Sequence, residues 1–102
     1  MEHDRAELAG LKLALGEALA SVPMSPIKAQ IGNLAAGSGV DAAAAVLAIH
    51  SGKLPAAINT RKVVDGMKLN VSGEVREANV GVAVSSVYSL GGQNAALVFK
   101  KV

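Results

Sequence analysis

Residues 27–52 have the sequence IKAQIGNLAAGSGVDAAAAVLAIHSG, in which nearly all side chains are small. The apolar pattern predicts a strand that ends at residues 31–32, followed by a helix that runs from Ala35 to a glycine stop at Gly52. Asn33 is the polar residue between them. The segment therefore predicts a strand, a polar junction and a helix.

The predicted helix is expected to be buried. Gly37 and Gly39 each cost on the order of 1 kcal/mol relative to alanine inside a helix, so they indicate close backbone contact with other elements. Most of the other positions are alanine, valine, leucine or isoleucine. A helix that is apolar nearly all round is expected in the middle of a protein. Asn33 would then lie at the positive end of a buried helix.

The composition limits the functions open to the chain. Its 102 residues predict a single domain, residues 1–102. The net charge of +2 comes from ten basic and eight acidic residues without a block of one sign, which argues against nucleic-acid binding. No cysteine is present, so these residues hold no disulfide, thiolate metal site or cysteine nucleophile. No apolar span reaches the roughly 18 residues of a membrane helix, and no signal peptide is visible, so we expect a cytoplasmic protein without a membrane partner.

The first twenty residues predict an amphipathic helix. Asp4 and Glu7 resemble a capping box, and leucines recur at helical spacing from Leu8 to Leu19. Pro23 and the residues before it are expected to end this helix.

Strands are predicted in several short stretches. Residues 24–31 and 67–71 have strand-like patterns, and residues 54–59 are expected to be extended. In residues 80–87 the first six alternate between valine and a smaller residue, and residues 95–101 begin with an apolar run. The last two stretches predict an antiparallel pair with a glycine-rich connection.

Few polar residues are candidates for chemistry. The Asn33 amide is placed to donate to a substrate carbonyl, although an N-cap explains the same residue. The glycines at 91–92 fit a ligand-facing loop or a plain hairpin turn. Lys28 is expected to point from its strand toward the Asn33 junction and to pair with Glu7 or Asp4. No Ser/His/Asp set or metal-ligating spacing can be assembled, so we expect neither a metal nor another cofactor.

Residues 28–33, KAQIGN, followed by Ala35-Ala36-Gly37, resemble the K-S-x-x-G-H…G-A-A-G segment of the β-ketoacyl-acyl carrier protein synthases. Three further segments agree with that family in order and spacing. Residues 4–11 resemble its D-x-x-E-x-x-A helix, residues 54–59 resemble its P-x-T-I-N stretch, and residues 90–95 resemble its F-G-G-T-N-A loop. The chain is thus similar to the C-terminal segment of these synthases over nearly all of its length.

The resemblance implies the thiolase-like fold, in which two related α/β halves form five layers with the Ala/Gly-rich helix in the middle one. The chain is then an incomplete C-terminal half of this α/β fold, with a mixed sheet, a C-terminal antiparallel strand pair and a buried helix. The sheet order of the half-domain is 3-2-1-4-5. Residues 24–31 match strand 3, and residues 80–87 and 95–101 match strands 4 and 5.

The resemblance also implies an acyltransferase reaction, the decarboxylative Claisen condensation of acyl and malonyl thioesters in fatty acid or polyketide synthesis. In that family a cysteine carries the acyl chain, and histidines from H-G-T-G-T and K-S-x-x-G-H promote the loss of carbon dioxide. The cysteine is absent here, and H-G-T-G-T would lie before Asp4. Asn33 stands at the second histidine, Ala29 replaces a serine, and Leu90 replaces the phenylalanine that gates the acyl pocket. Whether the chain is itself a 3-oxoacyl-acyl carrier protein synthase is therefore left open.

The family motifs place candidate roles on particular residues. The candidate catalytic residues are Asn33 and Lys28, with Lys28 orienting site groups. The candidate substrate-binding residues are Leu90, Gly91, Gly92 and Asn94.

Three hypotheses follow for the chain as a whole. It is a catalytically incomplete part of a ketosynthase, a non-catalytic binding module for an acyl carrier protein or a complete ketosynthase, or a subunit that lends Asn33 and its glycine loop to a site in another chain. The middle strands of the family sheet would lie upstream, which leaves strand edges open. We therefore expect a homodimer that buries the helix at residues 35–49.

Overall fold

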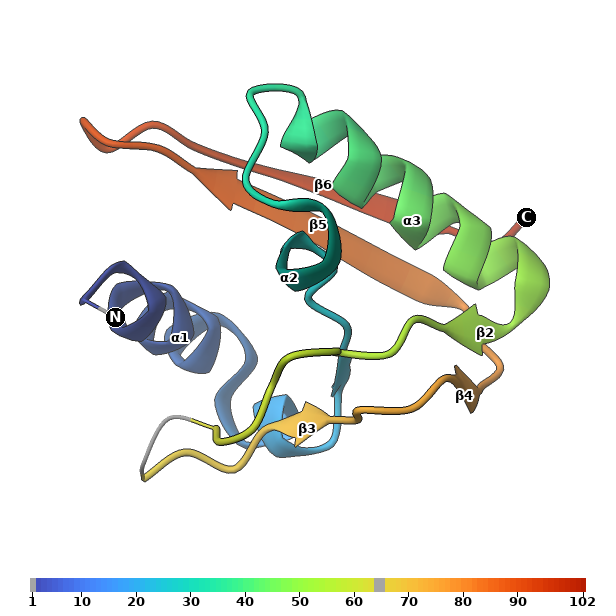
Figure 1. Ribbon diagram of the computed structural model, residues 1–102. Coiled ribbons are helices and arrows are strands. Elements are labelled where there is room, and N and C mark those ends of the chain that lie inside the picture. Colours follow the sequence, from blue (N-terminus) through green and yellow to red (C-terminus); the bar gives the residue numbers. More distant parts are fainter. Residues whose placement is uncertain (1, 64–65) are drawn as a thin grey trace.

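The computed structural model describes residues 2–63 and 66–102 as a small domain of mixed helices and strands (Figure 1). The elements are α1 (Glu2–Leu15), the 3₁₀ helix η1 (Gly16–Ala20), β1 (Pro23–Met24), α2 (Lys28–Ile31), α3 (Gly37–Ser51), β2 (Lys53–Leu54), β3 (Asn70–Val71), β4 (Arg76–Glu77), β5 (Val82–Tyr88) and β6 (Asn94–Lys100). The strands form three two-stranded sheets, with β1–β3 parallel and β2–β4 and β5–β6 antiparallel. None of the helices in the described part of the chain has the length and apolarity needed to cross a bilayer.

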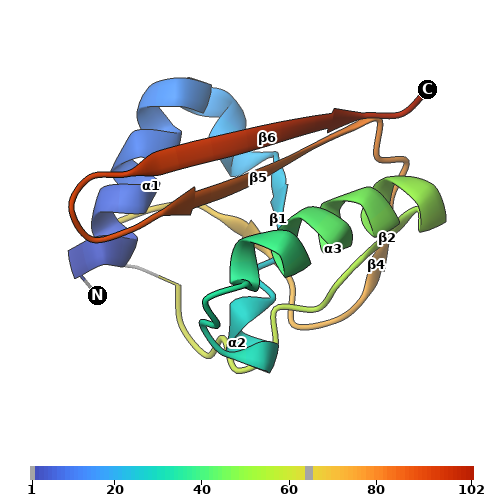
Figure 2. The ribbon, with the colours of Figure 1, turned by 90° about the horizontal axis from the view of Figure 1, so that it is seen from above.

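The β5–β6 hairpin is the longest strand pairing, and it confirms the predicted antiparallel pair. Its seven paired positions run from Val82 opposite Lys100 to Tyr88 opposite Asn94. Since successive residues of a strand point to opposite faces, Val82 and Val84 lie on one face of the hairpin and Ala83 and Ser85 on the other. α3 runs along the hairpin in both views (Figures 1 and 2).

α3 ends as predicted but is less buried than predicted. It stops at Gly52, whose left-handed φ of 66° suits a glycine C-cap. It begins at Gly37, two residues later than expected, because residues 35 and 36 form a turn. The prediction of a buried helix is wrong for this chain, since Leu47 is 62% exposed and Val46 is 46% exposed. The hairpin covers one side of α3, and no described element covers the opposite side.

Residues 24–31 do not form the predicted strand. β1 ends at Met24, and Lys28 begins the single helical turn of α2. Pro26 explains the difference, because proline has no N–H to donate to a strand partner and fixes its own φ. Helical hydrogen bonds follow instead, such as Gly32 N–H to the Lys28 carbonyl at 2.8 Å. Among the described strands β1 pairs with β3 and β5 pairs with β6, so separate pairs are present in place of the expected mixed sheet.

The amphipathic first helix is confirmed, although its details differ. Leu8 and Leu19 are both buried, but the α-helix gives way to η1 at Gly16, where φ is +57°. Asp4 lies inside α1, which begins at Glu2, so the capping-box prediction is wrong.

The predicted extended stretches are shorter than expected. β2 includes only Lys53 and Leu54, because Pro55 cannot continue a hydrogen-bonded ladder. Asn59 lies in a turn with a φ of +62°. Of residues 67–71, only Asn70 and Val71 form a strand.

The core is small. The buried apolar residues of the described chain are Leu8, Leu19, Ala48, Leu54 and Ala57. Larger apolar side chains remain exposed on α3 and on the hairpin, including Val84 at 59% and Val98 at 69%. Much apolar surface of these two elements is therefore open to other groups.

Candidate functional site

Lys28 and Asp41 form an ion pair between α2 and α3. Lys28 Nζ lies 2.8 Å from Asp41 Oδ2, and the two side chains are 35% and 17% exposed. The lysine stem lies over Gly37, where an added Cβ would be 3.6 Å from Lys28 Cε. Gly37 and Asp41 share a face of α3 because residues four apart on a helix are neighbours. The predicted pairing of Lys28 with Glu7 or Asp4 is therefore replaced by a pairing with Asp41.

Glu7 of α1 adds a third charge to this cluster. Burial raises the pKa of Glu7, the positive charge of Lys28 lowers it, and the negative charge of Asp4 raises it. The net shift is upward, so removal from water outweighs the attraction to Lys28. Three helices thus contribute to one charge cluster, which consists of Glu7, Lys28 and Asp41.

The segment after β2 holds α2 in place. Asn59 Nδ2 donates to the Ala29 carbonyl at 3.2 Å, and Gln30 Nε2 donates to the Ala56 carbonyl. Asn59 adopts its left-handed φ at low cost, since asparagine tolerates this region better than most residues. A helix of one turn is unstable by itself, so these two hydrogen bonds and the Lys28 ion pair fix its position.

Asn33 lies on the exposed connection between α2 and α3. The N-cap of α3 is Ala36, and no side chain caps that helix, so the N-cap explanation of Asn33 is wrong. Within residues 2–63 and 66–102 the Asn33 side chain makes no hydrogen bond. Its amide is therefore available to a ligand or to another part of a larger assembly.

The glycine-rich connection is a tight hairpin turn. Gly91 and Gly92 have φ values of +96° and +84°, which glycine adopts without the steric cost of a Cβ. Ser89 N–H donates to the Gln93 carbonyl at 3.0 Å and closes the turn. Leu90 is 84% exposed at its tip, and Asn94 begins β6.

The predicted site residues thus fall into separate groups. Lys28 belongs to the charge cluster, Asn33 to the α2–α3 connection, and the other candidates to the hairpin turn. Among the described residues no hydrogen bond or ion pair joins these three groups. These residues alone therefore do not bring the candidate groups together into a complete active site.

Sequence reasoning missed Asp41. The available signal was that Asp41 is the only Asp, Glu, Lys or Arg between Lys28 and Lys53. A single charge on a nearly apolar helix needs a partner when it is half-buried, and Lys28 was the nearest lysine before it in the chain.

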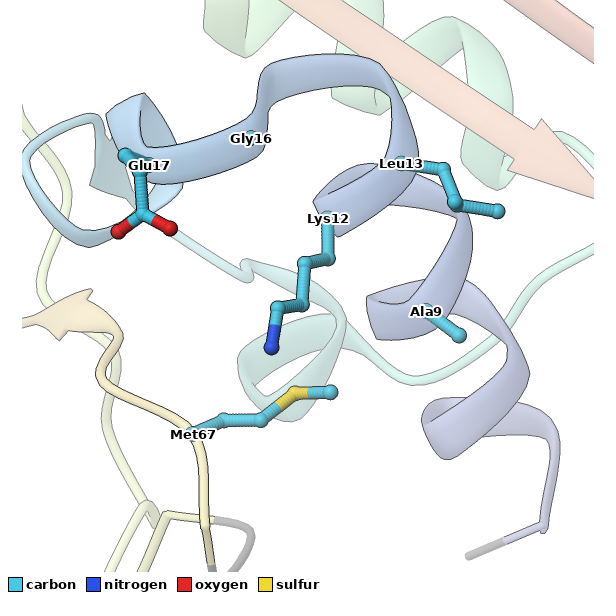
Figure 3. A pocket seen from close by; sticks show the side chains of 6 residues that line it. All are labelled: Ala9, Lys12, Leu13, Gly16, Glu17 and Met67. Atoms are coloured by element: carbon cyan, nitrogen blue, oxygen red, sulfur yellow. The ribbon is translucent and has the colours of Figure 1, made fainter.

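Two hollows are lined by residues other than the predicted site residues. One of about 520 Å³ is formed by α1, η1 and Met67, and Figure 3 shows Lys12 extending toward Met67 there. The other, of about 270 Å³, lies between α3 and the hairpin and is lined by Ser38, Gly39, Ala42, Ser85, Val87, Ala95 and Leu97. Neither hollow gathers a set of groups suited to catalysis. In the described part of the chain no three His, Cys, Asp or Glu side chains gather as metal ligands.

Comparison with known proteins decides the family. Residues 1–61 match the family described as Beta-ketoacyl synthase, C-terminal domain. The chain belongs to this family. The predicted resemblance to a C-terminal ketosynthase segment is thereby confirmed.

Similarity to curated proteins extends along nearly the whole chain. It is 37% identical over 101 residues to 3-oxoacyl-[acyl-carrier-protein] synthase 2 of Synechocystis sp., a match that covers 97% of this chain and 24% of that protein. It is 33% identical over 102 residues to nodulation protein E of Rhizobium meliloti, covering 98% and 25%. It is 36% identical over 99 residues to oxytetracycline polyketide putative beta-ketoacyl synthase 1 of Streptomyces rimosus, covering 95% and 23%. The chain therefore spans about a quarter of the length of the curated relatives it matches.

Proposed function

We propose that these residues act as the C-terminal part of a β-ketoacyl-acyl carrier protein synthase-like acyltransferase with the thiolase-like fold. The support is similarity along 95–97% of the chain to proteins named as a 3-oxoacyl-[acyl-carrier-protein] synthase and as a polyketide beta-ketoacyl synthase. In such an enzyme β5 and β6 extend a larger mixed sheet, and the outer side of α3 is covered. The exposed valines and leucine of these elements are consistent with that role.

The observation that carries a chemical role is the free Asn33 amide. Loss of carbon dioxide from a malonyl thioester places negative charge on the thioester oxygen, and an amide N–H donor stabilises such a charge. Asn33 lies three residues before the N-cap of α3, whose first turn has no acidic residue and no side-chain cap. The partial positive charge of that helix end adds to the same stabilisation. Asn33 thus serves as the oxyanion donor at the position where the family pattern has histidine.

Lys28 has a positioning role in this proposal. Its ion pair with Asp41 ties α2 to α3, and Glu7 lies within electrostatic reach on α1. Asn33 follows α2 after only Gly32, so the placement of α2 sets the placement of the Asn33 amide. The exposed turn with Leu90, Gly91, Gly92 and Asn94 would contribute one wall of the acyl-binding region.

Condensation requires a nucleophile to carry the acyl group, and these 102 residues have no cysteine. The chain by itself is therefore expected to show no turnover with an acyl thioester and malonyl-acyl carrier protein. Asn33→His alone should not rescue the reaction, because the nucleophile would still be missing. Turnover above the background without protein would contradict the proposal.

A binding role for an acyl carrier protein is the second candidate. Arg61, Lys62 and Lys68 are exposed basic residues, and acidic carrier proteins would be attracted to them. Affinity measured by titration with a carrier protein should fall as salt is added, since exposed charges are screened. The absence of binding at low salt would remove this candidate and leave the first one intact.

A further inference from the structure

The hollow between α3 and the β5–β6 hairpin has both of its walls in this chain. We call it the α3–hairpin hollow, and it is lined by Ser38, Gly39 and Ala42 of α3 and by Ser85, Val87, Ala95 and Leu97 of the hairpin. None of these residues is charged, and the hydroxyls of Ser38 and Ser85 make no hydrogen bond within residues 2–63 and 66–102. A mostly apolar space with a few free polar groups suits an uncharged organic ligand.

The α3–hairpin hollow lies toward the turn of the hairpin. β5 and β6 pair Val87 with Ala95, and both residues line the hollow. Two residues further along each strand, Ser89 N–H donates to the Gln93 carbonyl, so the same register continues. Because residues two apart lie on the same face, Ser89 and Gln93 share the face that borders the hollow. In both views α3 begins on the side of the hairpin turn and ends where the two strands open (Figures 1 and 2).

Gln93 provides a hydrogen-bond donor at the turn end of the α3–hairpin hollow. Ser89 Oγ donates to Gln93 Oε1 at 3.4 Å, and this contact orients the carboxamide. Gln93 Nε2 makes no hydrogen bond in the described part of the chain, so its two N–H groups are free to bind a ligand oxygen. The family pattern F-G-G-T-N-A has threonine at this position, and threonine has neither the amide nor the reach of glutamine.

We propose that the α3–hairpin hollow receives the acyl chain of a thioester substrate, and that Gln93 selects chains with an oxygen near the thioester, such as 3-oxoacyl groups. Asn33 precedes Gly37, the first residue of α3, by four positions, so a thioester at Asn33 lies at the same end of α3 as the hollow. A cavity of about 150 Å³ holds a benzene molecule, so about 270 Å³ suits a chain of roughly six to ten carbons. This inference rests on the proposed function, because it takes the ligand to be an acyl thioester.

NMR titration of the chain tests both parts of the proposal. The probes are the hexanoyl and 3-oxohexanoyl thioesters of N-acetylcysteamine, and both should shift the backbone amide signals of Gly39, Val87 and Ala95. The Kd of the 3-oxohexanoyl thioester should be lower by about threefold to tenfold, because it accepts one additional hydrogen bond. Gln93→Leu should make the two constants equal. Asn79→Leu removes an exposed carboxamide outside the hollow and should preserve the difference.

Filling the α3–hairpin hollow provides an independent test. Ala42→Leu should weaken the binding of both thioesters by about tenfold or more, because the larger side chain occupies the space of the ligand. Gly39→Ala adds a Cβ that meets nothing within 4 Å, so it should weaken binding less while keeping the fold. Ala14→Leu enlarges an exposed alanine of α1 and should leave both constants unchanged. Circular dichroism verifies that each variant is folded.

The result that would overturn the proposal is specific to the hollow. Signals that shift only outside it, equal constants for the two thioesters with the wild type, or a preference that survives Gln93→Leu would each do so. The proposed function is tested separately, by decarboxylation that depends on residue 33 in a complete enzyme. That dependence can hold while the hollow binds no thioester, so the two failures are distinguishable.

Discussion

Asp41→Asn is expected to lower the free energy of unfolding by about 1 kcal/mol, the upper end of the range for exposed ion pairs. The 2.8 Å contact between Lys28 Nζ and Asp41 Oδ2 is close enough for a charge-assisted hydrogen bond. Asp41 is only 17% exposed, which strengthens the interaction, whereas Lys28 at 35% exposure remains partly screened by water. Glu17→Gln changes an exposed charge without this contact and should shift the free energy by no more than about 0.5 kcal/mol.

A double-mutant cycle isolates the pair itself. Urea unfolding of the wild type, Lys28→Met, Asp41→Asn and the double variant should give a coupling energy of about 0.5–1 kcal/mol that decreases with salt. In Lys28→Met, the Glu7 pKa measured by NMR should rise further, since Lys28 is the group that lowers it. Additive effects of the two substitutions, together with an unchanged Glu7 pKa, would refute the charge cluster.

Three further predictions concern the elements around the site. Because the folded pKa of Glu7 is raised, wild-type stability should fall as pH increases from the ordinary glutamate pKa through the raised value, and Glu7→Gln should remove this decline in urea unfolding across that window. Gly52→Ala should destabilise the chain by about 1–2 kcal/mol in thermal or urea unfolding, because φ is +66° and the new Cβ would lie 3.2 Å from the Ala78 carbonyl oxygen. Gly10→Ala, on an open face of α1, should instead stabilise it by up to about 1 kcal/mol. Asn59→Ala should cost about 1 kcal/mol and speed amide exchange in α2, and unchanged exchange there would contradict its role in holding that turn.

Local patterns predicted the parts of the fold whose contacts are close in sequence. The hairpin followed from alternation on either side of a glycine-rich turn, and the end of α3 followed from Gly52. The prediction of a strand at residues 24–31 was wrong because its apolar residues are compatible with a strand or a helix, and Pro26 favoured the helical turn of α2. The prediction that α3 is buried was wrong for a different reason. An apolar sequence shows that a helix can be covered, but whether it is covered depends on which other elements are present.

The candidate site was only partly predictable for a similar reason. Family motifs pointed to Lys28 and Asn33, but the partner of Lys28 depends on how α2 packs against α3. The spacing of residues in the sequence does not show how these helices pack. It led to the prediction that Lys28 lies on a strand and pairs with Glu7 or Asp4. In the sequence, Asn59 is visible only as part of a family motif. Its hydrogen bond to α2 forms because the fold brings together residues thirty positions apart.

The most direct test of the ketosynthase assignment is malonyl-carrier-protein decarboxylation by a chimera. In this chimera, residues 1–102 replace the matching segment, about a quarter, of Synechocystis 3-oxoacyl-[acyl-carrier-protein] synthase 2. We predict that a folded chimera with Asn33 in place releases carbon dioxide more slowly than the parent enzyme. After Asn33→Ala removes the oxyanion donor, the rate should be about 10²–10³-fold below that of the parent, which is a larger loss than with Asn33 in place. Asn33→His should bring the rate closer to that of the parent. A folded chimera whose decarboxylation rate is the same with asparagine, alanine or histidine at position 33 would contradict the assignment of Asn33 to the reaction.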